Sequence, residues 1–374
     1  MKWKIKIGRY AGIDVYIHMT FFLLLLWVAV SHWLQGVGSA GVFIGIVFIL
    51  AIFVCVTLHE YGHALAARHY GIETRDITLL PIGGVARLER MPRKPIQEIY
   101  VALAGLAVNL VIAGVLFAWL HVTAGFAPLS ELSVVSGPLL ERLMMVNLFL
   151  LAFNLIPAFP MDGGRVLRAA LAMRSNYVEA TRKAAQVGQI FAFLFGVAGL
   201  FMGNPMLMVV ALFVWIGAAQ EAGMAHVNRA MSGIPVREAM VTDFKVLNHD
   251  DRLEHAVALT IAGSQNDFPV MHNGDVVGVL SQSALLSALR SHGEQSRVSQ
   301  FMQQSFTTVD AGAMLDRAFR KLSDCRCHTM PVLSDNRLVG LLTMDNVGEF
   351  VRIQSALQSK RRHSDLPNAW MPFI

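Results

Sequence analysis

The strongest constraint on this chain is a series of long segments without a charged side chain. A bilayer core about 30 Å thick needs about 20 helical residues at 1.5 Å each. Uncharged apolar runs of that order occur at Val15–Leu34, Leu34–Leu58, Ile99–Leu120, Leu143–Met161 and Val187–Gln220. The last run is 34 residues long and contains Gly203-Asn204-Pro205, which indicates two spans joined by a tight turn. The sequence therefore predicts about six transmembrane helices.

Composition supports a membrane protein and narrows its partners. Hydrophobic residues make up 55% of the 374 and charged residues 15%, against roughly 45–50% and 25% in soluble domains. These values exclude a disordered chain and argue against a wholly soluble enzyme. The formal net charge of +5 is too small to predict a nucleic-acid partner. Three Cys are too few for a disulfide framework, so Cys325 and Cys327 are expected to be reduced thiols.

Lys and Arg side chains cluster in alternate connections between the predicted spans. They occur at the N-terminus (Lys2, Lys4, Lys6, Arg9), in the second connection (Arg68, Arg75, Arg87, Arg90, Arg93, Lys94) and in the fourth (Arg165, Arg168, Arg174, Arg182, Lys183). The first, third and fifth connections, Gln35–Gly41, His121–Glu141 and Gly203–Pro205, contain none. Because cytoplasmic loops carry the excess of Lys and Arg, we expect a multi-pass protein of the cell membrane with both termini in the cytoplasm.

From about Arg229 the composition becomes that of a soluble domain, and the sequence repeats itself at an offset of 62 residues. Equivalent pairs are Met240 and Met302, Gly278 and Gly340, and Ser281 and Thr343. Each copy has the pattern of a helix, two short strands joined by a turn, and a second helix. The duplication resembles a tandem pair of cystathionine-β-synthase-type (CBS) domains. We therefore expect a membrane domain at 1–228 and a cytoplasmic α/β CBS domain at 229–374, with copies at about 234–292 and 296–353 and a basic tail.

The second apolar run leads directly into the sequence His59-Glu60-Tyr61-Gly62-His63. Residues four apart share a helix face, so His59 and His63 can bind one zinc ion. Glu60 lies beside the metal and can take a proton from water and deliver it to a leaving amine. The alternative is a pair of interfacial histidines with a glutamate extended toward the membrane surface. Ionisable groups next to a membrane span are usually functional, which favours the metal site.

A catalytic zinc needs a third protein ligand. Asp162 is the only carboxylate between Glu141 and Glu179, and it lies at the cytoplasmic end of the fourth predicted span. Pro157 and Pro160 interrupt that helix, so the carboxylate can turn inward. The alternative is that Asp162 caps a short helix at 163–173.

These motifs resemble those of the site-2 protease family of intramembrane zinc metalloproteases. The resemblance rests on HEYGH at 59–63 and NLIPAFPMDGG at 154–164 and covers about 8–224. With the CBS pair, the arrangement resembles the bacterial branch that includes sporulation pro-sigma-factor-processing proteases. It implies zinc ligands at His59, His63 and Asp162, a general base at Glu60, and Asn154 on the substrate backbone or the developing oxyanion. An interhelical hydrogen bond is the alternative for Asn154.

Two further segments match the family less closely. Asn109 lies in an Ala-Gly segment where Leu106 replaces the usual Pro, and Asn147 is expected to be structural. Alternation and a Gly pair in 76–87 predict a small β-hairpin. In the family, such a segment is proposed to pair with the substrate as an added strand. A plain surface loop is the alternative.

The CBS copies carry an incomplete nucleotide-binding pattern. In nucleotide-binding CBS domains, a Ser or Thr lies near phosphate and an Asp three residues later lies near ribose. The first copy has Ser281 but Ala284 in the place of the carboxylate, and the second has Thr343 and Asn346. The resemblance implies an adenine nucleotide such as ATP, ADP or AMP at Ser281, Thr343 and Asn346. The alternative is a module for dimerisation or substrate docking.

Together these features predict a polytopic α-helical membrane protein with a small membrane-associated β-hairpin and a CBS pair. The expected activity is zinc-dependent hydrolysis of a peptide bond within or near a transmembrane segment, with one Zn²⁺ per chain. Expected partners are a single-span membrane protein or signal-peptide remnant and a second copy bound through the CBS domains. The alternative function is a CBS-regulated metal or ion transporter that uses the same His and Asp cluster. Against it, the helices show no inverted repeat.

Overall fold

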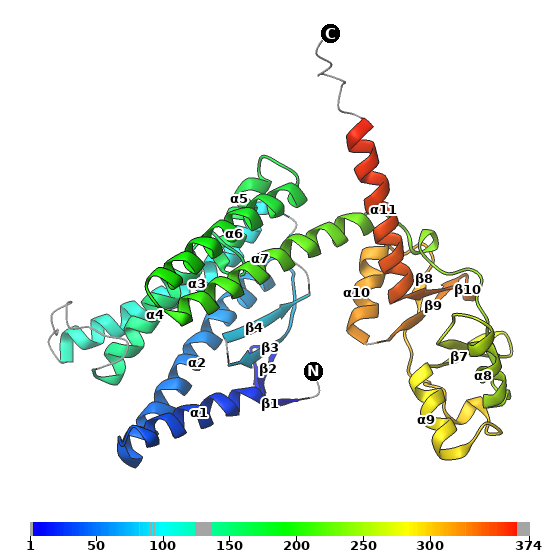
Figure 1. Cartoon of the computed structure of the whole chain (residues 1–374), viewed down its shortest axis with the longest axis horizontal. Coiled ribbons are helices and arrows are strands. Elements are labelled where there is room, and N and C mark those ends of the chain that lie inside the picture. Colours follow the sequence, from blue (N-terminus) through cyan, green and yellow to red (C-terminus); the bar gives the residue numbers. More distant parts are fainter. Residues whose placement is uncertain are drawn as a thin grey trace, which may run out of the picture. The chain divides into compact units, whose positions relative to one another are not determined.

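The computed structural model describes residues 3–81, 83–89, 92, 94–123, 137–325 and 327–364. They form two compact units, Met1–Ala225 and His226–Ile374 (Figure 1). The C-terminal residues 365–374 and most of the third connection (124–136) lie outside the described residues, whereas the predicted basic tail, 360–363, falls within the last described helix.

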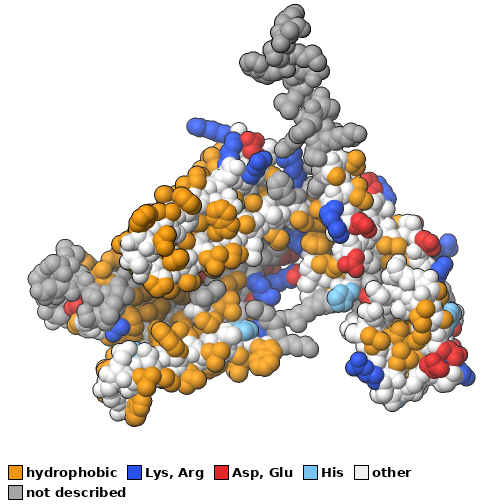
Figure 2. All heavy atoms as spheres, in the orientation of Figure 1, with side chains coloured by type: hydrophobic (Ala, Val, Ile, Leu, Met, Phe, Trp, Pro, Cys, Tyr) orange, Lys and Arg blue, Asp and Glu red, His pale blue; other side chains and the backbone are white. Residues whose placement is uncertain are grey.

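The first unit is built from helices, all of which except Asp162–Ala172 follow the predicted apolar runs. They are α1 (Thr20–Leu34), α2 (Gly38–His69), α3 (Pro95–Thr123), α4 (Leu139–Leu155), α5 (Asp162–Ala172), α6 (Tyr177–Phe201) and α7 (Pro205–Met231), the last of which extends past the end of the unit. Four of these described helices, α2, α3, α6 and α7, are long and apolar enough to cross a membrane. The face of this unit that is visible in Figure 2 is largely hydrophobic, and Phe43 on α2 and Phe193 on α6 are 67% and 66% exposed. Such surfaces suit lipid rather than water.

Two of the six predicted spans are shorter than expected. Helix α1 has 15 residues and α4 has 17, below the roughly 20 that a bilayer core requires. The predicted polytopic helical fold is thus confirmed, and these two of its helices are shorter than the apolar runs that contain them. In the first run, residues up to His18 form a strand, and helix α1 begins only at Thr20. In the fourth run, α4 ends at Leu155 because Pro157 and Pro160 cannot continue a helix.

A four-stranded sheet lies at the end of α2. Its strands are β1 (Lys4–Tyr10), β2 (Ile13–His18), β3 (Thr74–Leu80) and β4 (Gly83–Leu88), in the order β1-β2-β3-β4. The pair β3–β4 confirms the predicted hairpin, whereas β1 and β2 were not predicted. Strands β2 and β3 pair in parallel, so the segment before α1 and the segment after α2 lie at the same end of those helices. Strand β4 forms an edge of this sheet.

One buried carboxylate forms hydrogen bonds that link three strands of the sheet. Asp76 on β3 accepts hydrogen bonds from Lys4 Nζ on β1 (3.0 Å) and from Arg87 Nε on β4 (2.8 Å). Burial raises the pKa of the Asp76 carboxyl, but the hydrogen bonds from Arg87 and Lys4 outweigh burial and hold that pKa below its ordinary value. Asp76 therefore carries a negative charge that links the N-terminal strand to the hairpin.

The second unit contains the two predicted copies of a CBS fold. The first has β5 (Leu247–Asn248), α8 (Leu253–Ala262), β6 (Phe268–His272), β7 (Asp275–Leu280) and α9 (Gln282–His292). The second has β8 (Val309–Asp310), α10 (Leu315–Cys325), β9 (Thr329–Ser334), β10 (Arg337–Thr343) and α11 (Met344–Ser364). Each copy has a three-stranded mixed sheet. A disulfide joins Cys325 and Cys327, so the prediction of reduced thiols is wrong here.

The two copies exchange the segments that precede their sheets. Val236, which belongs to the first copy by sequence, lies in the core of the second copy, and Val298, from the second, lies in the core of the first. Val241 pairs with Leu341 and Val279 with Gln303 through reciprocal backbone hydrogen bonds. The same 62-residue offset that relates the sequences therefore also relates these contacts.

Candidate metal centre

Helix α2 supplies three neighbouring polar side chains to one buried site. His59 and His63 lie one helical turn apart and are 7% and 3% exposed, and Glu60 lies between them in the chain. Helix α3 lies against this turn of α2, and a Cβ atom on Gly62 would lie 2.7 Å from the backbone oxygen of Ala104. The close approach of the two backbones removes water from around the imidazoles.

The carboxylate opposite these histidines comes from the first residue of α5. Residues 156–161 between α4 and α5 are not helical, and the chain turns back tightly there. Gly163 and Gly164 make the turn fit: a Cβ on Gly163 would lie 2.3 Å from the Ile156 oxygen, and one on Gly164 would lie 2.6 Å from the Ala158 carbonyl carbon. Asp162 is 5% exposed, and no side-chain cap is made at the N-terminus of α5. The structure therefore directs this carboxylate toward α2.

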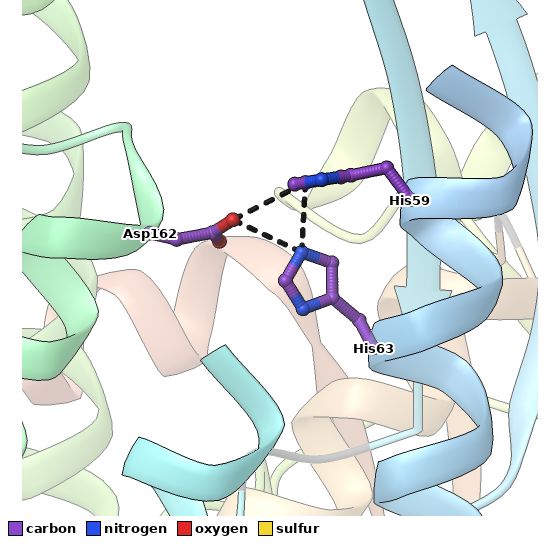
Figure 3. Close-up of side chains that lie close together, drawn as sticks. All are labelled: His59, His63 and Asp162. Carbon is purple, nitrogen blue, oxygen red and sulfur yellow. Dashed lines mark hydrogen bonds and ion pairs between the residues drawn. The ribbon is translucent and has the colours of Figure 1, made fainter. Parts of the chain in front are cut away.

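The three side chains converge on one point (Figure 3). Asp162 Oδ2 lies 3.2 Å from His59 Nε2 and 3.0 Å from His63 Nε2, and the two Nε2 atoms are 3.0 Å apart. The two imidazole planes are almost perpendicular, at 88°. Two buried imidazole nitrogens and one carboxylate oxygen facing a common centre form a set of donors that can hold a metal ion.

The surroundings of His63 fix which of its nitrogens faces that centre. Its Nδ1 lies 2.7 Å from the carbonyl oxygen of Val101 on α3. A carbonyl can only accept a hydrogen bond, so Nδ1 donates and Nε2 keeps a free lone pair. Gly105, one turn later on α3, lies beside the edge of the rings that faces this centre: a Cβ there would be 2.3 Å from His63 Nε2 and 2.9 Å from His59 Cε1. Only glycine fits at this position.

Glu60 lies against strand β4. Its Oε2 accepts a hydrogen bond from the backbone N–H of Ala86 at 3.2 Å. A Cβ on Gly84 would lie 2.8 Å from Glu60 Cγ, so this glycine lets the strand approach the glutamate. The β-hairpin and the histidine motif, which are separate in the sequence, thus form one site.

A cavity of about 350 Å³ opens onto these residues. It is lined by His59, Glu60, His63 and Asp162, by β4 (Gly83–Ala86), by Asn109 on α3, by Asn154 on α4, and by apolar and polar neighbours that include Phe153, Phe213 and Arg165. Asn154 is therefore in the same cavity as the His and Asp cluster. Asn147 is not among the residues that line this cavity, and its Nδ2 donates to the Leu143 carbonyl of its own helix at 2.8 Å.

The three CBS residues singled out in the sequence line a second cavity, of about 480 Å³, between the two copies. Ser281 Oγ accepts from the N–H of Ala284, and Thr343 Oγ1 accepts from the N–H of Asn346, so both hydroxyls cap helices. The Asn346 amide donates to the carbonyl oxygen of Ala239. The structure brings these residues to one cavity, with part of their hydrogen-bonding capacity already used.

Several residues contact the metal centre in ways that the sequence does not predict. Val101, Gly105, Gly84 and Ala86 contribute through a backbone atom or a missing side chain, which composition does not reveal. Arg165 follows Asp162 by three residues, and its Nη1 lies 3.6 Å from Asp162 Oδ1. The spacing within the motif could have identified Arg165, whereas the backbone contacts depend on packing between α2, α3 and β4.

Comparison with known proteins agrees with this architecture. The model of peptidase family M50 matches residues 47–137 and 130–198, which include both motifs, and the CBS domain model matches 236–291 and 298–351. Zinc metalloprotease MJ0392 of Methanocaldococcus jannaschii is 31% identical over 365 residues, 98% of this chain and 100% of that protein. Stage IV sporulation protein FB of Bacillus subtilis is 28% identical over 274 residues, 71% of this chain and 92% of that protein.

Among solved structures, the site-2 protease from Methanocaldococcus jannaschii is similar, with 37% sequence identity and a TM-score of 0.45, over 59% of this chain and 95% of that one. Zinc metalloprotease MJ0392 shows the family of this chain, because the two proteins align over almost their whole lengths. The chain therefore belongs to peptidase family M50, the site-2 protease family of zinc metalloproteases, and carries a tandem CBS pair at its C-terminal end.

Proposed function

We propose that this chain is an intramembrane endopeptidase in which His59, His63 and Asp162 hold one zinc ion beside Glu60. The observation that carries the proposal is the convergence of these three buried donors from α2 and α5. The substrate would be a single-span membrane protein or a signal-peptide remnant, cut within or near its transmembrane segment.

The donor set fits zinc well. Tetrahedral zinc with bonds of about 2.0–2.1 Å has neighbouring ligands about 3.3 Å apart, close to the 3.0–3.2 Å between these atoms. Three protein ligands leave a fourth position open, as in catalytic rather than structural zinc sites. The hydrogen bond from His63 Nδ1 to the Val101 carbonyl is the kind of outer contact that orients a metal-binding imidazole.

When bound, zinc polarises the scissile carbonyl and lowers the pKa of the attacking water. Glu60 would accept the proton of that water at its carboxylate and deliver it to the nitrogen of the leaving amine. Asn154 would donate its carboxamide N–H to the carbonyl oxygen as negative charge develops there. One such preorganised donor contributes about 3 kcal/mol to transition-state stabilisation.

Strand β4 would hold the substrate in an extended conformation. A transmembrane helix hides its amides in its own hydrogen bonds, so it must unwind locally before a peptide bond can be cut. Strand β4 is at an edge of its sheet and lines the cavity through Gly83–Ala86. An unwound segment could add to this edge as a further strand, which would place its backbone beside Glu60.

The remaining features of the proposal concern topology and regulation. We assign the membrane domain to 1–228 and the CBS domain to 229–374, with both chain termini in the cytoplasm. The grouping of β1–β4 at one end of α1 and α2 supports a common side for the N-terminus and the second connection. The CBS cavity at Ser281, Thr343 and Asn346 would take an adenine nucleotide, and the CBS pair would also support a homodimer.

The test is co-expression of the chain with candidate single-span membrane proteins, with cut sites located by mass spectrometry. Glu60→Gln should abolish cleavage, because its amide cannot accept the proton, while the zinc content stays near one per chain. The control is Glu73→Gln, because Glu73 is an exposed glutamate before β3, and it should cleave normally. Full activity of a folded Glu60→Gln protein would overturn the mechanism. Metal flux in proteoliposomes without any cleavage would favour the transporter instead.

A further inference from the structure

One buried polar side chain in the catalytic cavity has no role in the mechanism above. Asn109 on α3 is 1% exposed and lines the cavity that contains His59, Glu60 and Asp162. Neither its Oδ1 nor its Nδ2 has a hydrogen-bond partner among the residues that the structure describes. It is thus a complete carboxamide, buried and unpaired, at the wall of the active site.

An unpaired amide at this depth is costly. A buried polar group without a partner costs about 1–3 kcal/mol. Asn147 on α4 is 0% exposed and is half paired: its Nδ2 donates to the carbonyl of Leu143, while its Oδ1 has no partner among the described residues. Asn109 makes no such contact within its own helix or with a described neighbour. Its burial therefore does not serve helix packing.

The position of Asn109 on α3 places it close to the chemistry. It follows Gly105 by four residues, so the two share one face of the helix. Gly105 contacts the imidazoles of His59 and His63 so closely that a Cβ atom would overlap them. Asn109 therefore extends, by one turn, the same face of α3 that lies beside the metal centre, and it borders the cavity together with Asn154 and β4.

We propose that Asn109 is a substrate-binding residue whose carboxamide hydrogen-bonds a peptide group of the unwound substrate next to the bond that is cut. A carboxamide offers one acceptor and donor N–H groups, as a peptide group does, so the two are complementary. A substrate strand paired with β4 forms backbone hydrogen bonds along only one of its two edges. The N–H and C=O groups on its other edge need hydrogen-bond partners within the cavity. This inference rests on the proposed peptidase function.

The test compares Asn109→Leu with the wild type in the purified full-length protein. Leucine has nearly the shape of asparagine and removes only the hydrogen-bonding groups. We expect kcat/KM for the substrate found by co-expression to fall about 10- to 100-fold, with the zinc content still near one per chain. The Tm of the variant should equal or exceed that of the wild type, because an unpaired buried amide has been removed. The Tm measurement needs no substrate. Asn109→Ala, which cannot overfill the site, should lose activity to a similar extent.

Substrate binding is measured separately in the Glu60→Gln background, which binds without cutting. Adding Asn109→Leu should reduce the amount of intact substrate that co-purifies with the chain. Asn147→Leu is the matched control, because Asn147 is equally buried but outside the cavity, and it should keep its kcat/KM within about threefold of the wild type.

Three results would overturn the proposal. These are wild-type kcat/KM in Asn109→Leu, undiminished substrate retention in the double variant, or a lower Tm with loss of zinc, which would indicate a structural role. Failure of the peptidase function itself is distinguishable, because the wild type would then cleave no substrate, or Glu60→Gln would cleave it as well as the wild type does.

Discussion

At the scale of single residues, the metal centre depends on a glycine, Gly105, whose lack of a side chain leaves room for the two imidazoles. The backbone of α3 passes beside the donor edge of the two imidazoles at Gly105, and any larger residue would have its Cβ 2.3 Å from His63 Nε2. The carbonyl of Val101, one turn earlier, orients the same ring. Helix α3 therefore acts as a wall of the site without contributing a side chain to the metal.

Gly105→Ala should weaken zinc binding. The added methyl group has to displace the ring of His63, because the nearby atoms belong to imidazoles held between two packed helices. Changes in the contacts that orient ligands typically cost about 10- to 100-fold in metal affinity, and cleavage should fall at least as much. The measurement is competition for zinc between the purified protein and a chelator of known affinity.

Gly114→Ala on the same helix is the control. Nothing lies within 4 Å of a Cβ built at Gly114, and alanine favours a helix over glycine by about 1 kcal/mol. This variant should bind zinc normally and unfold at the same temperature or higher. Equal zinc affinities for the two alanine variants would show that Gly105 does not support the site.

The sequence identifies the three residues that converge at the candidate metal centre better than the groups that position them. The four-residue spacing of His59 and His63 places both on one helix face, and Asp162 stands out as the only carboxylate in its region. These are local patterns. Gly105 and Val101 act through the distance between two backbones, which depends on how α2 and α3 pack, and a single sequence does not encode that distance visibly.

At the scale of elements, a buried ion network anchors the helix that begins with Asp162. Arg168 on α5 is 2% exposed and donates from Nε to Glu98 Oε1 on α3 at 2.7 Å, and from Nη1 to Glu221 Oε2 on α7 at 2.9 Å. Its guanidinium also lies about 5 Å from the ring centres of Phe159 and Tyr177. The contacts of Arg168 thus join α5 to α3, α6 and α7.

Arg168→Met should destabilise the membrane unit strongly. Methionine can fill much of the space, but it leaves the carboxylates of Glu98 and Glu221 without their shared cation. Removing one partner of a buried ion pair costs about 3–5 kcal/mol, which would appear as a lower Tm of the full-length protein in detergent. The loss should be accompanied by weaker zinc binding, since Asp162 begins the same helix.

Lys183→Met tests the specificity of that effect. Lys183 pairs with Glu179 at 2.9 Å, but both side chains are about half exposed, and such pairs contribute about 0–1 kcal/mol. A loss of stability in Arg168→Met no larger than in Lys183→Met would contradict the anchoring role of Arg168.

The elements themselves were predictable to different degrees. Long apolar runs predicted α2, α3, α6 and α7, and two prolines predicted the end of α4. Strand β2 was missed because Val15–His18 continues directly into the apolar residues of α1. Its alternating pattern makes sense only beside β3, which lies almost 60 residues later in the chain. Pairing over that separation is a property of the tertiary structure.

At the scale of the whole chain, the two CBS copies pack against each other through reciprocal methionine–glycine contacts. Gly340 of the second copy receives the side chain of Met240, and Gly278 of the first receives that of Met302: a Cβ on either glycine would lie 2.6–2.7 Å from the methionine sulfur. The sequence repeat revealed that Met240 matches Met302 and that Gly278 matches Gly340. It did not reveal that each methionine contacts the glycine of the other copy.

Gly340→Ala should therefore destabilise both copies together. Overfilling a packed core typically costs about 1–3 kcal/mol, and the contact formed by Met240 joins the two halves. Hydrogen exchange of the full-length protein should show faster exchange in β6 and β7 as well as in β9 and β10.

Gly348→Ala in α11 has nothing within 4 Å of the new Cβ and should leave hydrogen exchange unchanged. Faster exchange confined to the second copy in Gly340→Ala would show that the halves unfold independently.

The exchange of Val236 and Val298 between the two cores also bears on how the duplication arose. A lone copy would leave its own core short of the valine that the other copy now provides. Two identical polypeptides could fill both gaps by trading those segments around a twofold axis. The ancestor of this unit is thus expected to have been a homodimer, and gene fusion then turned a concentration-dependent association into a permanent intramolecular one.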